Sequence, residues 1–599
     1  MCGIAGVVGP SLNGGDTQTL GRIAGLLGHR GPDSSGLWSG EGAQLAHARL
    51  SILDLSEAGS QPMGRDGLQL VYNGEIYNFR ELRGGLEASH PDSVFRSQTD
   101  SEVLLESFRR RGAACLPELR GMFAFAVWNE REKSLFLARD AFGIKPLYYR
   151  PSSDGGLAFA SELAPLLELG QPEVDASALR DYLFYGYVPS PKTAWRGIFK
   201  LPAAHFLTWR DGEFKVERYW RLEPGERLGD PEQIVRQTRD WVDRAVSESM
   251  VSDVPVGVFL SGGVDSGAVA AFCRGSLEAF TLGQRQRHRD ESQLAAQLAS
   301  HLGLQHHVHP AESITLDDAL DHVVRAFGEP FGDSGALSVW LISRFASQHV
   351  KVVLGGDGGD ELFCGYRWYG EAAAEPASLA RSALRTIAPV MTKLYRSSAR
   401  RAAAPGFDRF AAFVGTFVPS QIDALAGPAL EPGRQEDPHW RLREFWREDL
   451  PLRQRLQYAD IHTLLADRML PKVDRASMAW SLEVRPPLLD TRLASFALSV
   501  DPETLRDPAS DRGKMNLRRA IESRLPAGYL DQPKKGFNLA IARWVKNDPE
   551  PWRGALARLT ARGYIRRHRF MDLTNEQTWS LLVLDRWLAT YQSGYRDVA

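Results

Sequence analysis

Short apolar runs alternate with turn-forming residues along the first quarter of the chain. The runs are LQLVY (68–72), FAFAVW (123–128), SLFLA (134–138) and LAFA (157–160), and Gly, Pro and Asn punctuate the segments between them. Short strands interrupted in this way are typical of antiparallel sheets. TDSEVLLESFRRR (99–111) has helical spacing instead, with Thr99 and Glu102 at the two capping-box positions. The pattern predicts an α+β sandwich domain.

The pattern changes after about residue 235, where strands, Gly-rich turns and helices follow one another. Strands are expected within PVGVFL, EAFTL, QHHVH and VKVVL, with a helix over DESQLAAQLASHLG. This alternation predicts an α/β domain with a parallel sheet, helices on both faces and ligands at the carboxyl ends of the strands. We therefore expect domains at 1–212 and 235–599, joined by a polar linker at 213–234.

Composition and charge narrow the class of protein. The 599 residues carry 72 basic and 74 acidic side chains, so overall electrostatics require neither a nucleic-acid nor an anionic-membrane partner. The Ala- and Arg-rich segment 371–412 is expected to form surface amphipathic helices rather than a nucleic-acid patch. The sequence shows no apolar run long enough to span a membrane and no signal-peptide pattern, which predicts a cytoplasmic protein.

Four cysteines occur without CxxC spacing, which argues against a disulfide scaffold or a four-thiolate zinc site. Cys2 differs from the others because removal of Met1 would make it the first residue. It can be a small apolar residue that begins a strand, or a nucleophile whose own α-amine acts as the base. The ordinary pKa values, about 8 for the amine and about 8.5 for a thiol, make that proton transfer nearly isoenergetic.

Two Gly-rich segments stand where predicted strands end. LSGGVDSG (260–267) opens a helix, and the N–H groups of such a turn hold phosphate-sized anions. It lacks the Gly-Lys-Ser/Thr of the ordinary P-loop, which argues against a kinase or GTPase. In GGDGGDELFCGY (355–366) the carboxylates could be loop solubilisers, but glycines on both sides favour close contact with a ligand and a metal or a base.

SGGVDS resembles the pyrophosphate loop of the ATP pyrophosphatase superfamily. Further motifs, in order along nearly the whole chain, are similar to the glutamine-hydrolysing asparagine synthetase family: its class II amidotransferase domain and its synthetase domain. The first domain carries MCGIAG, HRGPDSSG, HARLSILDL, YNGEIYNF, SQTDSEVLL and LRGMFAFAVW…LFLARDAFGIKPLYY. The second carries SGGVDS, GDGGDELFCGY, DRMLPKVDRASMAWSLEVRPPLLD and KKGFNLAIARWV.

The resemblance implies an N-terminal nucleophile (Ntn) amidotransferase sandwich followed by an ATP pyrophosphatase domain. Cys2 would hydrolyse glutamine, with oxyanion donors from the Asn73 side chain and the Gly74 backbone. Arg49 would bind the glutamine α-carboxylate, while Glu75 and Asp100 would bind its α-amine. Asp100 could also have a structural role in the first turn of the helix capped by Thr99, and the two roles are compatible.

For the second domain the resemblance implies ATP as a substrate and Mg²⁺. Ser261, Gly262, Gly263 and Ser266 would hold the β- and γ-phosphates, while Asp265 and Asp360 would bind the metal. Lys514 would stabilise pyrophosphate and the acyl-adenylate. The adenosine would lie against Phe259, Leu282, Gly355 and Gly356. Ammonia would pass between the two sites through an internal tunnel.

One residue departs from the family pattern. Asparagine synthetases often have Glu where this chain has Asp357, the proposed proton acceptor for ammonia. The resemblance nevertheless implies aspartate as the acceptor and asparagine as the product, and another carboxylate, such as a polysaccharide uronate or a specialised metabolite, is the alternative. A non-hydrolysing regulatory relative is disfavoured by the retained site residues. The implied partners are small molecules, with a homodimer as one assembly state found in the family.

Four histidines cluster near EAFTL and QHHVH. Their spacing, at 301, 306, 307 and 309, is not that of a zinc motif. The sequence therefore predicts a structural role for them in a strand.

Overall fold

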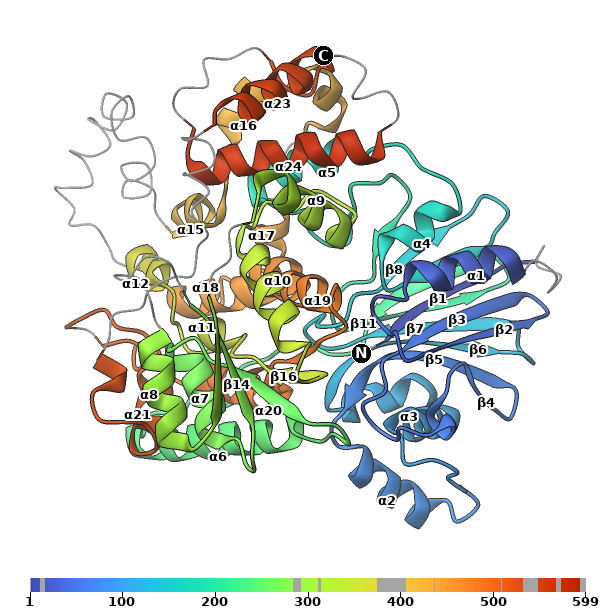
Figure 1. The fold of residues 1–599 in the computed structure, drawn as a ribbon, viewed down its shortest axis with the longest axis horizontal. Coiled ribbons are helices and arrows are strands. Elements are labelled where there is room, and N and C mark those ends of the chain that lie inside the picture. The colour runs from blue at the N-terminus through green and yellow to red at the C-terminus, as the bar shows by residue number, and fades with distance from the viewer. Residues whose placement is uncertain are drawn as a thin grey trace.

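The computed structural model describes residues 2–10, 17–283, 292–310, 314–373, 406–435, 437–507, 509–531, 548–566 and 573–592. The motif KKGFNLAIARWV lies outside these residues. So does most of the Ala- and Arg-rich segment 371–412, for which surface amphipathic helices are predicted. The described part divides into an N-terminal half with two antiparallel sheets and a C-terminal half built around a parallel sheet (Figure 1).

Two six-stranded antiparallel sheets form the N-terminal half, which confirms the predicted sandwich. The first has the order β10 (Phe199–Lys200), β8 (Tyr148–Pro151), β9 (Leu157–Ala160), β1 (Gly3–Val8), β3 (Ala43–Arg49), β2 (Ser34–Gly40). The second has the order β12 (Glu213–Arg218), β11 (His205–Arg210), β7 (Ser134–Arg139), β6 (Gly121–Asn129), β5 (Leu68–Ile76), β4 (Met63–Arg65).

Helices cover the outer faces of this sandwich, and apolar side chains fill its centre. Ile4 and Val8 of β1 belong to the same buried cluster as Val71 of β5 and Ala124 of β6, so this core lies between the sheets. Helix α1 (Thr17–Leu26) packs on the first sheet, and α3 (Asp100–Arg111) packs on the second. The result is a four-layer αββα arrangement in which the start of β1 comes close to the end of β5.

The predicted linker at 213–234 begins too early. Residues 213–218 form β12, which pairs with β11 along its whole length and completes the second sheet. The turn between them is Asp211-Gly212, with φ of 51° and 86°, a dipeptide that favours tight hairpins. The connection to α6 (Pro231–Ser249) therefore starts after Arg218.

A parallel five-stranded sheet forms the centre of the C-terminal half, as predicted. Its order is β15 (Gln305–His309), β14 (Glu278–Leu282), β13 (Val256–Phe259), β16 (Val352–Leu354), β17 (Glu483–Arg485). The order reverses direction between the neighbouring strands β13 and β16. The crevice beyond the carboxyl ends of two such strands is where open α/β sheets bind ligands.

Helices surround this sheet and extend above it (Figure 1). The first of them in the chain are α6, α7 (Val264–Phe272), α8 (Ser292–Leu302), α9 (Leu316–Phe327), α10 (Gly335–Ala346), α11 (Gly359–Leu362) and α12 (Arg367–Ala373). Later helices are α15 (Gly406–Val414), α16 (Pro419–Leu425), α17 (Trp440–Glu444), α18 (Leu452–Asp460), π-helix η5 (Ile461–Met469), α19 (Leu470–Met478), α20 (Thr491–Ser499), α21 (Met515–Ile521), α23 (Glu550–Ala561) and α24 (Asn575–Tyr591).

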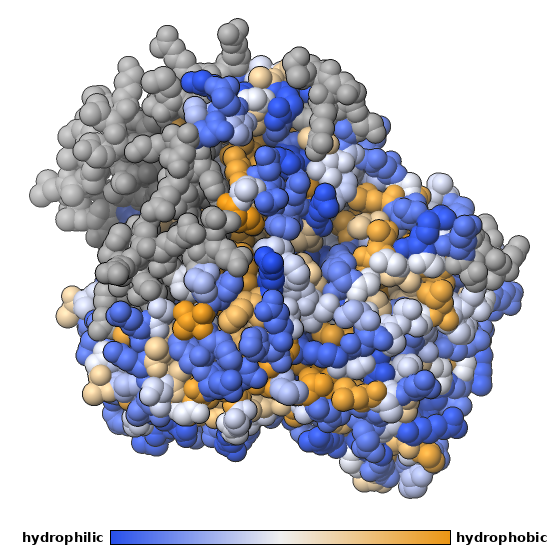
Figure 2. Space-filling model, in the orientation of Figure 1, coloured by the Kyte–Doolittle hydropathy of each residue, from blue (hydrophilic) through white to orange (hydrophobic). Residues whose placement is uncertain are grey.

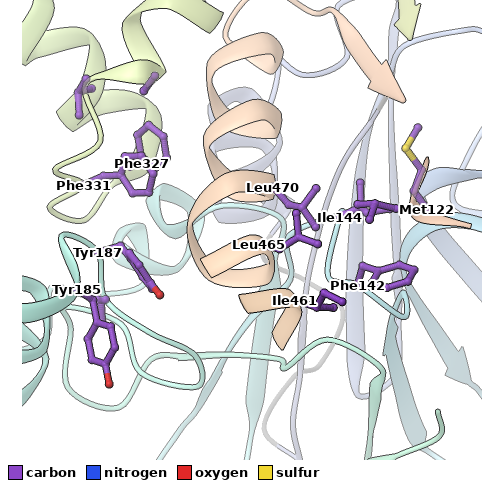
Figure 3. Packing of buried hydrophobic residues seen from close by; sticks show 14 of the residues in the cluster. Met122, Phe142, Ile144, Tyr185, Tyr187, Phe327, Phe331, Ile461, Leu465 and Leu470 are labelled. Atoms are coloured by element: carbon purple, nitrogen blue, oxygen red, sulfur yellow. The ribbon is translucent and has the colours of Figure 1, made fainter. Parts of the chain in front are cut away.

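The two halves share one continuous core. Figure 3 shows Met122 and Ile144 of the N-terminal half beside Leu465 and Leu470 of the C-terminal half, all in one buried cluster. Helix α5 (Ala176–Tyr185) also crosses the boundary, because the Tyr182 hydroxyl donates a hydrogen bond to the Ser580 carbonyl at 2.7 Å. The two halves are therefore packed together as a single body and are not joined by the linker alone.

In the view of Figure 2 most of the face is hydrophilic, and apolar residues appear in small groups. No helix among the described residues is long and apolar enough to cross a membrane.

Candidate functional sites

Cys2 lies at the junction of the two N-terminal sheets. It immediately precedes β1, whose flanking partners β3 and β9 fix its position. The Cys2 backbone N–H donates to the Asn73 Oδ1 atom at 3.1 Å, which ties it to β5 of the other sheet. Burial raises the pKa of the Cys2 thiol, although a nearby amino-terminal charge opposes this shift. The thiol is therefore mostly protonated at neutral pH and needs a base to become a nucleophile.

The opposite end of the Asn73 amide is available to a ligand. Its Nδ2 atom is buried and has no hydrogen-bond partner within the described part of the chain. A buried donor without a partner costs about 1–3 kcal/mol, so its retention calls for an explanation. The next residue must be glycine, because a Cβ on Gly74 would lie 2.2 Å from the Met122 carbonyl oxygen. Asn73 and Gly74 therefore lie next to Cys2, where the resemblance implies an oxyanion site.

Arg49 and Asp100 line the same pocket as Cys2. The Arg49 guanidinium donates to the carbonyls of Ser56 at 2.8 Å and Asp54 at 2.6 Å, which orients its planar fork at the pocket wall. The Asp100 Oδ2 atom accepts from the Tyr72 hydroxyl at 2.7 Å and from the Ile76 N–H at 2.9 Å. Burial raises the pKa of Asp100 to about 6.

Glu75 completes the acidic part of this pocket. Its Oε2 atom lies 3.2 Å from Nη2 of Arg485, while its Oε1 atom is buried without a hydrogen-bond partner in the described residues. Burial, followed by repulsion from Asp100, raises the pKa of Glu75 well above its ordinary value. Two carboxyl groups that resist ionisation together favour a ligand that brings a positive charge between them.

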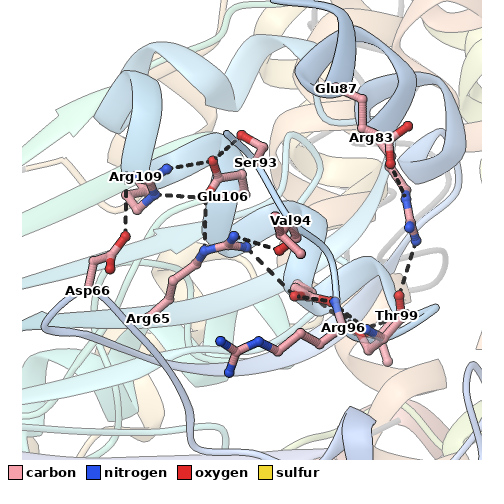
Figure 4. A network of polar contacts seen from close by, with 12 residues as sticks. Arg65, Asp66, Arg83, Glu87, Ser93, Val94, Arg96, Thr99, Glu106 and Arg109 are labelled. Carbon is pink, nitrogen blue, oxygen red and sulfur yellow. Dashed lines mark hydrogen bonds and ion pairs between the residues drawn. The ribbon is translucent and has the colours of Figure 1, made fainter. Parts of the chain in front are cut away.

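A polar network fixes the start of α3 and hence Asp100 (Figure 4). Glu106 accepts from Ser93 at 2.6 Å and from Arg109 at 2.7 Å. Burial opposes its ionisation, but these hydrogen bonds and one from Arg110 lower the pKa of Glu106 to about 2. Thr99 caps the helix by accepting the Glu102 N–H at 3.1 Å, as predicted.

The expected reciprocal half of the capping box is absent from this helix start. The Glu102 carboxylate accepts the Ser97 N–H at 2.7 Å and the Arg96 N–H at 2.9 Å instead of the Thr99 N–H. Glu102 thereby holds the preceding loop against the helix. The capping-box prediction is confirmed for the Thr99 side chain, which caps the helix, and is wrong for the Glu102 side chain, which does not accept the Thr99 N–H.

The second site is a cavity of about 280 Å³ at the reversal point of the parallel sheet. The predicted residues that line it are Phe259, Ser261, Asp265, Ser266, Gly355, Gly356, Asp357 and Asp360. The two loops approach closely, because a Cβ on Gly356 would lie 2.8 Å from the Ser266 backbone nitrogen. Leu282 is not among the lining residues and packs with Phe259 in an apolar cluster behind it. Gly262 and Gly263 lie in the loop that joins β13 to α7.

Lys514 lies between the two carboxylates predicted to bind metal. Its Nζ atom forms ion pairs with Asp265 and, at 2.7 Å, with Asp360. Burial opposes protonation, but the two carboxylates raise the pKa of Lys514, so the lysine is charged. Two facing carboxylates beside a turn of N–H groups form a donor set that suits a hard cation and its phosphate ligands. The residues present therefore fit Mg²⁺ bound to a nucleotide.

Asp357 lies in the same cavity. Burial raises its pKa, and repulsion from Asp265 adds to this shift while Lys472 opposes it. Glu361 is a neighbour that the sequence did not assign: it accepts from the Tyr366 hydroxyl at 2.6 Å, and burial raises its pKa to about 8.

Comparisons with known proteins cover both halves of the chain. Residues 1–220 match the glutamine amidotransferase domain family, and residues 237–589 match the asparagine synthase family. The chain belongs to the asparagine synthase family. It is 31% identical to asparagine synthetase [glutamine-hydrolyzing] 1 of Bacillus subtilis, over 98% of this chain and 96% of that protein. These matches make it a glutamine-dependent amidotransferase ligase of the asparagine synthetase type.

Two other relatives show the range of this family. A putative asparagine synthetase [glutamine-hydrolyzing] of Mycobacterium tuberculosis is 33% identical over 91% of this chain and 88% of that protein. Amidase chry2 of Gibberella zeae is 30% identical over 61% of this chain and 59% of that protein. Proteins named for different activities thus match the same chain.

The sequence did not single out the residues that join the two sites. Arg30 is buried and donates to the Cys2 carbonyl at 3.1 Å and to Asp474 of α19 at 3.0 Å. Glu483 of β17 lines the Cys2 pocket although it belongs to the other domain. Its neighbour Arg485 donates to Glu483 at 2.6 Å and contacts Glu75. Both stand in the motif SLEVRPPLLD, which marked the family but gave no sign of this contact.

Proposed function

We propose that this enzyme hydrolyses glutamine at Cys2 and uses the ammonia to amidate an acyl-adenylate formed from ATP, with aspartate as the acceptor and asparagine as the product. The observation that carries the proposal is the buried Asn73 Nδ2 donor beside Cys2. It has the position and chemistry of an oxyanion ligand and no partner among the described residues.

In the first reaction the Cys2 thiol gives its proton to the α-amine exposed after Met1 is removed. The thiolate attacks the glutamine carboxamide carbon, and Asn73 and Gly74 stabilise the oxyanion. Ammonia leaves, and water then hydrolyses the thioester to glutamate. Arg49 binds the glutamine α-carboxylate, and Glu75 with Asp100 binds its α-ammonium.

Ammonia then moves to the second cavity inside the protein. Met122 adjoins Gly74, and Leu465 lines the second cavity, while both belong to the apolar cluster between the domains (Figure 3). An apolar path keeps ammonia neutral and therefore nucleophilic.

In the second reaction the acceptor carboxylate attacks the α-phosphorus of ATP, and pyrophosphate leaves. Ser261, Gly262, Gly263 and Ser266 hold the phosphates, and Phe259, Gly355 and Gly356 contact the nucleoside. Asp265 and Asp360 would hold Mg²⁺, which supplies positive charge at the phosphates. Lys514 stabilises the departing pyrophosphate. Ammonia attacks the acyl carbon, AMP leaves, and Asp357 accepts the proton that the new amide loses.

A different acceptor carboxylate is the second candidate. Asp357 favours it, because Asp is one methylene shorter than the Glu expected of asparagine synthetases at this position. The extra space would change which acceptor reaches the adenylate.

The test is pyrophosphate release by the purified enzyme with Mg-ATP and glutamine, comparing aspartate with a panel of other carboxylic acids and identifying the products by mass spectrometry. Asparagine and AMP from aspartate support the proposal, and turnover of another acid alone refutes the choice of aspartate. Cys2→Ala should abolish the glutamine-dependent reaction and preserve the ammonia-dependent one. Equal loss of both would refute the division of labour between the sites.

A further inference from the structure

Three metal-ligating side chains converge at the opposite end of the parallel sheet from the nucleotide cavity. Glu278 is the first residue of β14, whereas Leu282 at its other end packs behind the cavity. His307 lies on the neighbouring strand β15, in register with Phe280. His349 comes from the segment between α10 and β16. Three elements far apart in sequence thus meet at one point.

The ligand atoms have the separations that a small cation requires. Glu278 Oε2 lies 2.9 Å from Nε2 of His307 and 3.4 Å from Nδ1 of His349, and all three atoms lie within 4.8 Å of one another. Ligand atoms about 2.0–2.2 Å from a tetrahedral zinc ion are about 3.3–3.6 Å apart. The 3.4 Å separation lies within this range, and the 2.9 Å separation is slightly shorter.

A second observation distinguishes this cluster from an ordinary ion pair. The Nε2 atom of His307 is buried and forms no hydrogen bond among the described residues, although a carboxylate oxygen lies 2.9 Å away. The two atoms are close, but their orientation does not suit an N–H···O bond. A cation placed between them would use the lone pairs of both.

The surrounding rings hold the two imidazoles in place. His307 stacks on Phe280 with ring centres 5.4 Å apart, and the His349 ring lies 5.5 Å from Phe280. Phe345 of α10 packs against His349 at 5.4 Å. A site whose ligands are already ordered by packing loses little entropy when metal binds.

We propose that Glu278, His307 and His349 form a binding site for a first-row transition-metal ion such as Zn²⁺. Two imidazoles and one carboxylate select transition metals over Mg²⁺ and Ca²⁺, which prefer all-oxygen sites. His349 is exposed, so water can complete the coordination. The bound ion joins the segment after α10 to the edge of the sheet and stabilises the folded protein by mass action.

The spacing of the histidines in the sequence could not reveal this site. Two of its three ligands, Glu278 and His349, come from outside the histidine cluster at 301–309. The expectation that His301, His306 and His309 are not ligands is unaffected.

The experiment measures zinc binding to the full-length enzyme after removal of metals with a chelator, in excess Mg²⁺ to occupy the carboxylates of the nucleotide cavity. Binding is followed by calorimetry, and the melting temperature is measured with and without zinc. The medium is mildly alkaline, because imidazole binds metals only in its neutral form. His349→Ala removes one ligand, and His301→Ala, an exposed histidine on α8, is the matched control.

We expect one tight equivalent of zinc and a higher melting temperature in the wild type and in His301→Ala. His349→Ala should weaken zinc binding by at least about tenfold. Residues that only hydrogen-bond to a metal ligand already cost about tenfold or more in affinity when they are replaced, and His349 is proposed to be a ligand itself. His349→Cys should retain binding and, with Co²⁺, add a thiolate-to-metal absorption band that the wild type lacks, which a purely structural role for His349 could not produce. The proposal is overturned if the wild type takes up no tight zinc, or if His349→Ala and Glu278→Gln bind it as tightly as His301→Ala.

Discussion

Replacing Arg485 with Met tests the contact through which β17 of the synthetase domain supports the glutamine pocket. Arg485 is fully buried, donates to Glu483 at 2.6 Å and lies 3.2 Å from Glu75. It also donates to the backbone carbonyls of Ser249 at 2.9 Å and Val251 at 2.6 Å. Met fills a similar volume and removes only the charge and the donors.

The loss of folding stability should be large, because Glu75 and Glu483 remain buried without the cation that they share. Removing one partner of a buried ion pair costs about 3–5 kcal/mol. With an unfolding entropy of about 2.1 cal/mol/K per residue, a single body of about 600 residues has about 1.3 kcal/mol/K. The melting temperature should therefore fall by about 2–4 °C. Arg492→Met is the control, since the Arg492 side chain is 26% exposed and pairs with Glu248 at 2.8 Å, and its loss should cost about 1 kcal/mol or less.

The effect should depend on pH in a defined direction. Burial opposes ionisation of Glu483, but Arg485 outweighs it, so the pKa of Glu483 is lowered in the native enzyme. That lowered pKa gives stability above the ordinary carboxyl pKa, which is lost as the pH falls. In Arg485→Met the strongest opposing charge is gone and only the amino-terminal charge and Lys145 still oppose burial, so the pKa of Glu483 rises and stability is lost as the pH increases. The difference between the two proteins should widen from about pH 5 to about pH 8.

Scanning calorimetry at several pH values measures this difference, and glutaminase kinetics report the pocket. Because Glu75 and Glu483 both line it, KM for glutamine should also increase. The double variant Arg485→Met/Glu483→Gln lacks one of the two carboxylates that Arg485→Met leaves without a cation. Its melting temperature should therefore be higher than that of Arg485→Met. A fall of less than about 1 °C, or an equal fall at all pH values, would show that Arg485 does not compensate these carboxylates.

Three further predictions concern the sites themselves. Asn73→Ala should lower glutaminase kcat by about 10²–10³-fold, the usual cost of one oxyanion donor, while ammonia-dependent pyrophosphate release stays unchanged; a loss of both would point to misfolding. Gly356→Ala should separate the two phosphate loops and reduce pyrophosphate release, because its Cβ meets the Ser266 backbone at 2.8 Å, whereas Gly84→Ala, with no atom within 4 Å, should be silent. Because the pKa of Asp100 is about 6 and its ionised form binds an ammonium, glutaminase kcat/KM should fall as the pH drops through about 6, and a flat profile there would exclude this role.

The sequence predicted most strands because their signals are local. β5, β6 and β7 alternate or run apolar between turn residues, and each lies where the pattern placed it. The predicted domain boundary at 212/213 divides the hairpin of β11 and β12, because its strands are partly exposed and their polar residues resemble those of a linker. Asp211-Gly212 between two runs of alternating residues was the signal that could have revealed it.

Site residues were predictable where one short motif holds both the ligand and its support. The glycines around Asp265 and Asp357 belong to such motifs, and the cavity contains both residues. Leu282 does not line it, because its position depends on packing against an apolar cluster rather than on a turn. Glu483 and Arg485 could not be assigned from sequence, since their contacts with the Cys2 pocket depend on how two domains dock.

That docking brings one strand, β17, to both candidate sites. The side chains of β17 reach the glutamine pocket through Glu483 and Arg485, while the Arg485 carbonyl accepts the Gly355 N–H of the second cavity at 2.8 Å. Arg30 makes a second connection, from the Cys2 carbonyl to Asp474 of α19. Ion pairs buried at such a junction are costly to form and are strongly directional, so they fix the register of the domains more than they add stability. A fixed register is what a path for ammonia between two cavities requires.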